Sequence, residues 1–69
     1  MDDLSAQIGE AAGTVWRALE GSTGWVTAAQ LRKQTSLSND AFQRALGWLA
    51  RESKVQFEVS GKVVKVMLR

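Results

Sequence analysis

Four residue types are missing from this 69-residue chain, which has no Cys, His, Pro or Tyr. Without cysteine no disulfide can stabilise the fold, and without Cys or His the usual ligands of a structural zinc ion are lacking. The same absences remove the commonest general base, the thiol nucleophile and the phenolic acid. We therefore expect no enzyme, no catalytic residue, no cofactor, no metal and no small-molecule substrate. A domain this small also needs an efficient core, a partner or both, because it buries only about 60% of its unfolded surface.

Long hydrophobic runs are also absent. No apolar stretch approaches the roughly 18 to 20 residues of a membrane span. No basic segment leads into an apolar one, as it would in a signal peptide. We therefore expect a cytoplasmic protein that makes no contact with a membrane.

Charge is unevenly distributed along the chain. Residues 1–20 hold four carboxylates and one arginine, a net charge of −3, whereas residues 21–69 hold eight basic and three acidic side chains, a net charge of +5. A basic remainder favours a polyanionic partner away from the N-terminus. Ordinary surface charge is the alternative interpretation.

Apolar residues recur at helical spacing in three segments, which predicts helices over residues 3–19, 28–34 and 39–52. The expected inward stripe of the first helix is Leu4, Ile8, Ala11, Ala12, Val15 and Leu19, with Trp16 at the edge of the core. The expected stripe of the third helix is Phe42, Ala45, Leu46, Leu49 and Ala50.

Polar residues mark where the second and third helices begin. Thr27 is followed three residues later by Gln30, the pattern of a capping box. Ser38 is a suitable N-cap for the third helix. A short helix, a turn with one apolar residue, Leu37, and a longer helix form the helix-turn-helix arrangement.

The C-terminal residues change to the alternation of strands. With a turn at Ser60-Gly61, the expected hairpin pairs Val55 with Val66 and Phe57 with Val64, and it buries Phe57 against the core. Trp25-Val26 is expected to add a third strand. The order helix, strand, helix, helix, strand, strand predicts an α+β winged helix-turn-helix fold with a small antiparallel sheet, as a single domain over residues 1–69.

Residues 45–52 read Ala-Leu-Gly-Trp-Leu-Ala-Arg-Glu. This string resembles a family of small bacterial and archaeal winged helix-turn-helix domains of unknown function. Residues 13–19 and 27–31 are similar to the same family, so the resemblance covers nearly the whole chain. It implies a stand-alone winged helix domain and supplies no biochemical function, because fold alone does not fix function.

The first half of the third helix is the candidate for reading DNA. In a helix-turn-helix protein these residues meet base edges, which here are Asn39, Asp40, Gln43 and Arg44. Gln suits adenine and Arg suits guanine, while Asp40 would oppose a phosphate or accept from cytosine. The first hypothesis is therefore a transcription regulator or nucleoid-associated factor that binds double-stranded DNA, plausibly as a dimer. A solvated helix face is the alternative for any single residue. The candidates for phosphate contact are Arg32, Lys33, Arg51, Lys54 and Lys62.

Trp48 supports a different function. It lies about 130° from the centre of the buried stripe, and packing within the domain and anchoring an interface are equally open readings. The second hypothesis is a protein-interaction winged helix, a homodimer or an adaptor, that binds no DNA and uses Gly47, Trp48, Val63 and Met67. Ser5, Gly9 and Gly13 on the back of the first helix are a weaker sign of helix–helix contact, with a frayed N-terminal helix as the alternative.

Overall fold

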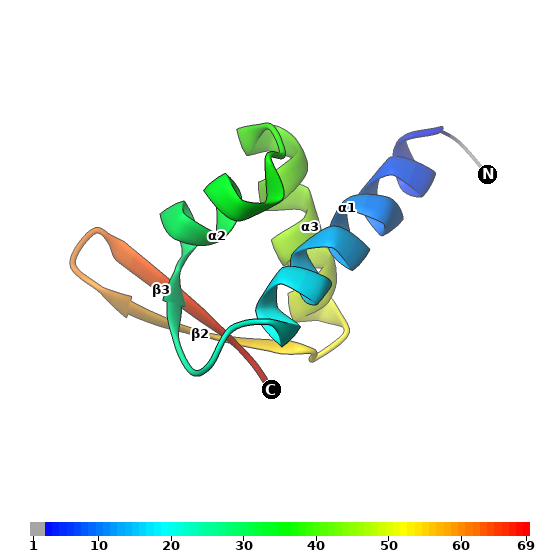
Figure 1. The fold of residues 1–69 in the computed structure, drawn as a ribbon. Helices are drawn as coiled ribbons and strands as arrows, with labels where there is room; N and C mark the ends of the chain where they lie inside the picture. Colours follow the sequence, from blue (N-terminus) through cyan, green and yellow to red (C-terminus); the bar gives the residue numbers. More distant parts are fainter. Residues whose placement is uncertain (1–2) are drawn as a thin grey trace.

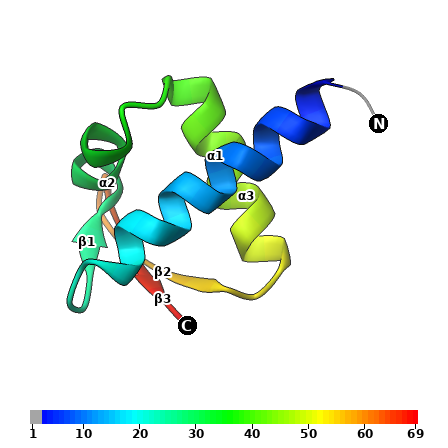
Figure 2. The same cartoon turned by 45° about the vertical axis from the view of Figure 1, so that its right-hand side comes forward.

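The computed structural model describes residues 3–69 and shows three helices on one side of a three-stranded antiparallel sheet (Figure 1). The elements are α1 (Asp3–Glu20), β1 (Val26–Thr27), α2 (Ala28–Thr35), α3 (Asn39–Arg51), β2 (Val55–Ser60) and β3 (Val63–Leu68). This order confirms the predicted winged helix-turn-helix topology. The helix α1 lies across α3 and packs mainly against it (Figure 2).

The core lies where α1, α2 and α3 meet the sheet. Its buried residues are Ala11, Ala12, Val15, Leu19, Leu31, Phe42, Ala45, Leu46, Leu49, Val55 and Val66. No polar side chain is buried among the described residues. Two helical positions that we expected in the core are exposed. Leu4 is 47% exposed because the first turns of α1 extend beyond the body of the domain (Figure 1), and Ala50 is exposed because it lies to one side of the α3 stripe.

Both predicted caps are present, and they set the geometry of the helix-turn-helix. The Thr27 hydroxyl accepts a hydrogen bond from the Gln30 amide at 3.1 Å, and the Gln30 side chain accepts one from the Thr27 amide at 3.4 Å. The Ser38 hydroxyl accepts from the Ala41 amide at 3.2 Å. These bonds satisfy backbone donors that a helix start leaves free, so they fix where α2 and α3 begin.

The end of α3 is closed by a serine in a left-handed conformation. Ser53 has φ 58°, its amide donates to the carbonyl of Ala50, and the Lys54 amide donates to the carbonyl of Leu49, both at 3.0 Å. This is the pattern of a Schellman motif, in which glycine is the usual residue. The motif turns the chain sharply from α3 into β2.

The predicted third strand is present but one residue later than expected. Val26 pairs with Val66 and Thr27 with Lys65, so β3 is the middle strand of the order β1-β3-β2. Trp25 precedes the strand and is 40% exposed.

The predicted register of the hairpin was wrong by two residues. Val55 pairs with Leu68 and Phe57 with Val66, which makes Gly61 and Lys62 the turn. Gly61 has φ 60°, whereas Lys62 is not among the residues with positive φ. That combination fits a type II′ turn, which takes glycine at its first central position.

Because a shift of two residues preserves the side-chain alternation, the same face of β2 still points toward the helices. Phe57 is nevertheless 41% exposed and Val59 67% exposed, contrary to the predicted burial of Phe57. Their strand β2 is at the edge of the sheet, and the hairpin extends away from the helices (Figure 1). The core position at this level belongs to Val66 in the middle strand, which is fully buried.

Candidate nucleic-acid interface and a neighbouring groove

The first half of α3 presents polar side chains to solvent. Phe42, Ala45 and Leu46 fix the helix against the core, and Asn39 and Gln43, which lie on one flank of this buried stripe, are both exposed. The remaining predicted DNA contacts are exposed as well: Arg32, Lys33, Arg44, Arg51, Lys54 and Lys62. Exposure permits contact with DNA, and it is also what an ordinary solvated surface shows.

The structure places these cations in different parts of the surface. Arg32 and Lys33 lie in the last turn of α2, close in the chain to the start of α3. Arg51 lies in the last turn of α3, at its other end. The polar residues at the start of α3 are therefore flanked by cations at both ends of the helix-turn-helix.

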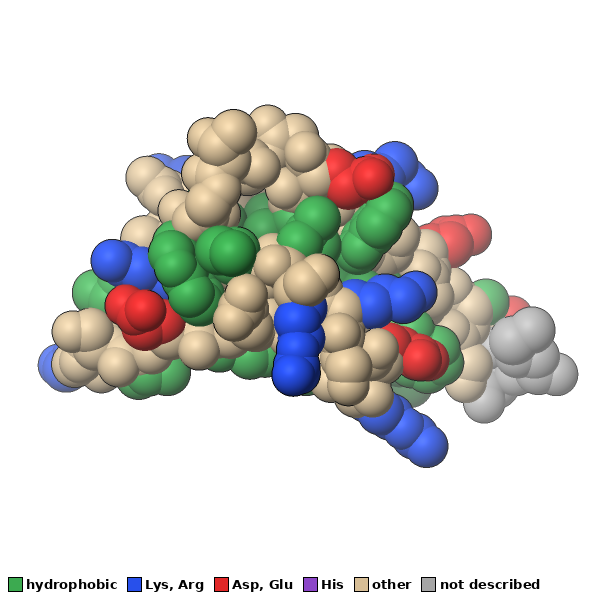
Figure 3. Space-filling view, turned by 90° about the horizontal axis from the view of Figure 1, so that it is seen from below, with side chains coloured by type: hydrophobic (Ala, Val, Ile, Leu, Met, Phe, Trp, Pro, Cys, Tyr) green, Lys and Arg blue, Asp and Glu red, His purple; other side chains and the backbone are tan. Residues whose placement is uncertain are grey.

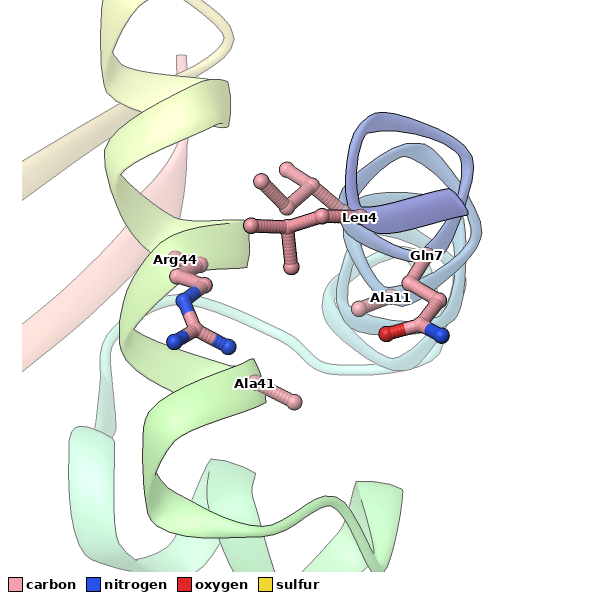
Figure 4. Close-up of a pocket in the computed structure, with 6 residues that line it drawn as sticks. Leu4, Gln7, Ala11, Ala41 and Arg44 are labelled. Atoms are coloured by element: carbon pink, nitrogen blue, oxygen red, sulfur yellow. The ribbon is translucent and has the colours of Figure 1, made fainter. Parts of the chain in front are cut away.

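Arg44 lies on the side of α3 that faces the first turns of α1. It lines a hollow with Leu4, Gln7, Ile8, Ala11 and Ala41. Figure 4 shows Leu4 extending from α1 toward α3, with the guanidinium of Arg44 on the α3 side. The hollow has a volume of about 20 Å³, which is room for about one water molecule. It is no ligand pocket.

Lys62 lies at the tip of the hairpin, beside the N-terminus of α2. The two segments 27–29 and 62–64 line an open hollow of about 300 Å³. The N-terminal end of a helix carries partial positive charge, so Lys62 and α2 make this part of the surface electropositive.

A second face of α3 forms a groove with α1. The groove has a volume of about 200 Å³, and its lining residues are Gly9, Ala12, Gly13, Trp16, Trp48, Leu49 and Lys54. Trp16 is 37% exposed and Trp48 42% exposed. The placement of Trp48 therefore differs from both a fully buried core residue and a residue on the outer face of α3.

The glycines of this groove leave its floor open. A Cβ atom added at Gly9 would meet nothing within 4 Å, and one added at Gly13 would meet only the Arg17 guanidinium, at 3.4 Å. The monomer therefore gives no steric reason for either glycine. The sequence interpretation missed Trp16 as a surface residue, although its position on the flank of the apolar stripe was a usable signal.

The residues predicted for an interface are not brought together. Trp48 lines the groove, whereas Val63 lines the hollow near the hairpin tip. Val63 is 46% exposed, and Met67 is half-buried. Strand alternation places both on the face of the sheet that points away from the helices. A Cβ atom at Gly47 would meet nothing within 4 Å.

The surface seen from below combines hydrophobic and basic side chains. Figure 3 shows hydrophobic side chains exposed between Lys and Arg side chains, with a few carboxylates among them. Within residues 3–69 no group of three or more acidic side chains is arranged to hold a metal ion. No helix in the same range has the length and apolar character needed to cross a membrane.

A helix-turn-helix followed by a β-hairpin packed against it defines the class of winged helix-turn-helix proteins. Within this class, the chain belongs to the winged helix-turn-helix domain family DUF2582, whose model matches residues 1–68. The family predicted from the sequence is thereby confirmed. An uncharacterised protein of Methanocaldococcus jannaschii, MJ1608, is 40% identical over 57 residues, which is 80% of each chain.

Solved structures share the fold. Protein BT2368 from Bacteroides thetaiotaomicron is 33% identical, with a TM-score of 0.79 over 91% of this chain and 76% of that one. HlyU from Vibrio cholerae is 21% identical, with a TM-score of 0.66 over 99% of this chain and 80% of that one. At 21% identity the second likeness shows the fold alone.

Proposed function

We propose that this protein binds double-stranded DNA and inserts α3 into the major groove. The observation that supports this most directly is the exposure of Asn39 and Gln43 on the first half of a helix that its buried stripe anchors in the core. Residues at this position of a helix-turn-helix contact base edges. An amide side chain such as Gln43 can pair with adenine in the major groove.

Phosphate contacts come from the cations around α3. Arg32 and Lys33 at the end of α2 and Arg51 at the end of α3 flank the reading residues. Lys62 contributes from the hairpin tip, next to the N-terminus of α2. Lys54 contributes least, because its side chain lines the groove toward α1. With about five phosphate contacts, affinity is modest and sensitive to salt.

The proposed role is that of a non-catalytic regulator of transcription or a nucleoid-associated factor in the cytoplasm. The supporting chemistry is the net charge of +5 over residues 21–69 and the polar reading face of α3. Asp40 limits affinity for any sequence, because its exposed carboxylate stands one residue from Asn39 and repels nearby phosphates.

The test is to titrate a labelled DNA duplex with the protein at about 50 mM and 200 mM salt and to measure binding by fluorescence anisotropy. We expect binding that weakens with salt, and a salt slope that falls by about two when Arg32→Ala and Arg51→Ala are combined, because each variant removes one phosphate contact. Arg69→Ala, which removes an exposed cation at the C-terminus, is the control and should bind like the parent. Absence of binding at the lower salt, or a slope unchanged in the double variant, would refute DNA binding through α3.

A second candidate function is protein interaction without DNA. The exposure of Trp48, 42% in the isolated chain, favours it, because tryptophan is enriched at interface hot spots. Sedimentation of Trp48→Ala beside the parent tests this function. If the parent and the variant have equal masses and bind any partner equally well, Trp48 does not contribute to an interface.

A further inference from the structure

The groove between α1 and α3 has the character of an interface. Trp16 and Trp48, which are 37% and 42% exposed, stand beside Gly9, which has open space around it, and Gly13, which only the Arg17 guanidinium approaches. Glycine inside a helix costs about 1 kcal/mol relative to alanine. Since the monomer has space for a side chain at Gly9, close approach of another chain is a physical reason for its absence.

The exposed stripe of α1 is complementary to itself when two copies run antiparallel. At about 100° per residue, Gly9, Gly13 and Trp16 share one side of the helix. A two-fold axis near Gly13 places Trp16 of one copy over Gly9 of the other, within about one residue rise of 1.5 Å. The largest side chain of the stripe then meets the position with none.

Charges beside the stripe are complementary in the same arrangement. Glu10 and Arg17 are both exposed and lie two turns apart on one flank of α1, on either side of Gly13. The two-fold axis that brings Trp16 to Gly9 also brings Glu10 of each copy beside Arg17 of the other. The groove itself is lined by Lys54, and the second α1 carries the acidic segment of residues 1–20, with a net charge of −3.

We infer that the groove is occupied by α1 of a second copy of this chain, in an antiparallel two-fold dimer in which Trp16 and Trp48 cover the incoming helix. This inference rests on the protein interaction of the second candidate function and names its partner, but it does not exclude DNA binding. It leaves Asn39 and Gln43 free, because Trp48 faces α1 and not the reading side of α3. The dimer and DNA binding are therefore compatible.

The expected dimer is weak. The helix α1 has 18 residues and is about 27 Å long, so one helix pair buries less than the roughly 800 Å² per partner of a standard interface. We expect the mass of the full chain, measured by sedimentation in low salt, to double as the protein concentration rises from about 10 µM to 1 mM. A chain that remains a monomer at about 1 mM would overturn the inference.

The matched variants are Gly9→Gln and Gly47→Gln. Both sites lie in helices and have open space around the added side chain, so both variants keep the fold. Gly9→Gln fills the place of the second Trp16, and we expect its dissociation constant to rise at least about tenfold. Gly47→Gln should dimerise like the parent. A dimer that survives Gly9→Gln, or one that only Gly47→Gln disrupts, uses another face and contradicts the antiparallel α1 pair while leaving protein interaction possible.

Charge reversal tests the orientation of the two helices. Glu10→Arg and Arg17→Glu each create two like-charged contacts per dimer, and we expect each to weaken association about tenfold at low salt. The double variant restores opposite charges and should return to within about threefold of the parent. If the double variant is as weak as either single variant, the helices are not antiparallel about Gly13. DNA titration of the same proteins keeps the two proposals separate, since loss of the dimer leaves the reading face of α3 intact.

Discussion

Helix α3 exposes two surfaces of different chemistry. One flank carries Asn39 and Gln43, which are polar and do not line any of the three hollows described above. Its side toward α1 carries Trp48, which lines a groove with Trp16. The same buried stripe of α3 holds both surfaces in place. The two surfaces are separated by their different angles around the axis of this one helix. A small domain can therefore present two separate faces, a polar face that we propose reads DNA and an aromatic face that we propose contacts a second copy.

The largest predicted effect removes both surfaces at once. Phe42→Ala should lower the free energy of unfolding by about 3–5 kcal/mol, because Phe42 is 1% exposed and holds α3 in the core. This is a large part of the stability of so small a domain. Urea denaturation followed by circular dichroism measures the loss.

Phe57→Ala is the matched control for Phe42→Ala. Phe57 is 41% exposed on the edge strand, so truncation should cost about 1 kcal/mol or less. A loss as large as that of Phe42→Ala would show that Phe57 is covered in solution, as the sequence had suggested.

The next effect separates the two surfaces. Trp48→Ala should weaken dimer formation by about 2 kcal/mol and leave DNA affinity unchanged, because truncation removes a hot-spot side chain from the groove only. Gln43→Ala should do the reverse, with a loss of about 1–3 kcal/mol of discrimination between duplexes and no change in mass. Sedimentation and anisotropy on the same samples provide both measurements. Variants that lose both activities together would mean that the two faces act as one.

A smaller effect concerns the glycines of the two surfaces. Gly9→Ala and Gly47→Ala should each raise the free energy of unfolding by about 1 kcal/mol at low protein concentration, because alanine favours the helix and its Cβ meets open space at both sites. Thermal unfolding measures the gain. A loss of stability in Gly9→Ala alone would show that the monomer itself needs that glycine.

The smallest effect lies at the end of α3, beyond both surfaces. Ser53→Gly should stabilise the domain by about 0.5 kcal/mol, because serine is strained at φ 58° and glycine is not. Ser53→Ala, which keeps the strain, should show no gain. Because neither substitution alters Gln43 or Trp48, DNA affinity and mass should not change; a shift in either would mean that the end of α3 controls one of the surfaces.

Local signals made the helical part of the fold predictable. Thr27 with Gln30 and Ser38 correctly marked the starts of α2 and α3, because capping depends on residues only three apart in the chain. The register of the hairpin was harder to predict from the sequence, since Ser60-Gly61 and Gly61-Lys62 are both possible turns. The positive φ of Gly61 at the first turn position decided between them, together with Glu58 opposite Lys65.

The sequence predicted which residues contribute to the candidate sites, but it did not predict how these residues are arranged in space. The sequence identified Gln43, Arg44 and Trp48 on the third helix, yet it did not show that Arg44 and Trp48 both turn toward α1, or that Trp16 joins Trp48. It also grouped Val63 with Trp48, and the fold places them in separate hollows. Helical periodicity gives the direction of a side chain from its own axis, not the neighbour that it meets.

By itself the sequence determined the winged helix-turn-helix fold, because periodicity and caps are local properties that each segment carries. Its lack of Cys and His likewise determined that no disulfide forms and that the usual structural zinc ligands are missing. Only the tertiary structure decided which exposed residues share a surface. The crossing of α1 over α3 creates the groove of Trp16 and Trp48, and the central position of β3 buries Val66 and leaves Phe57 exposed. These outcomes depend on contacts between segments far apart in the chain, which no local pattern specifies.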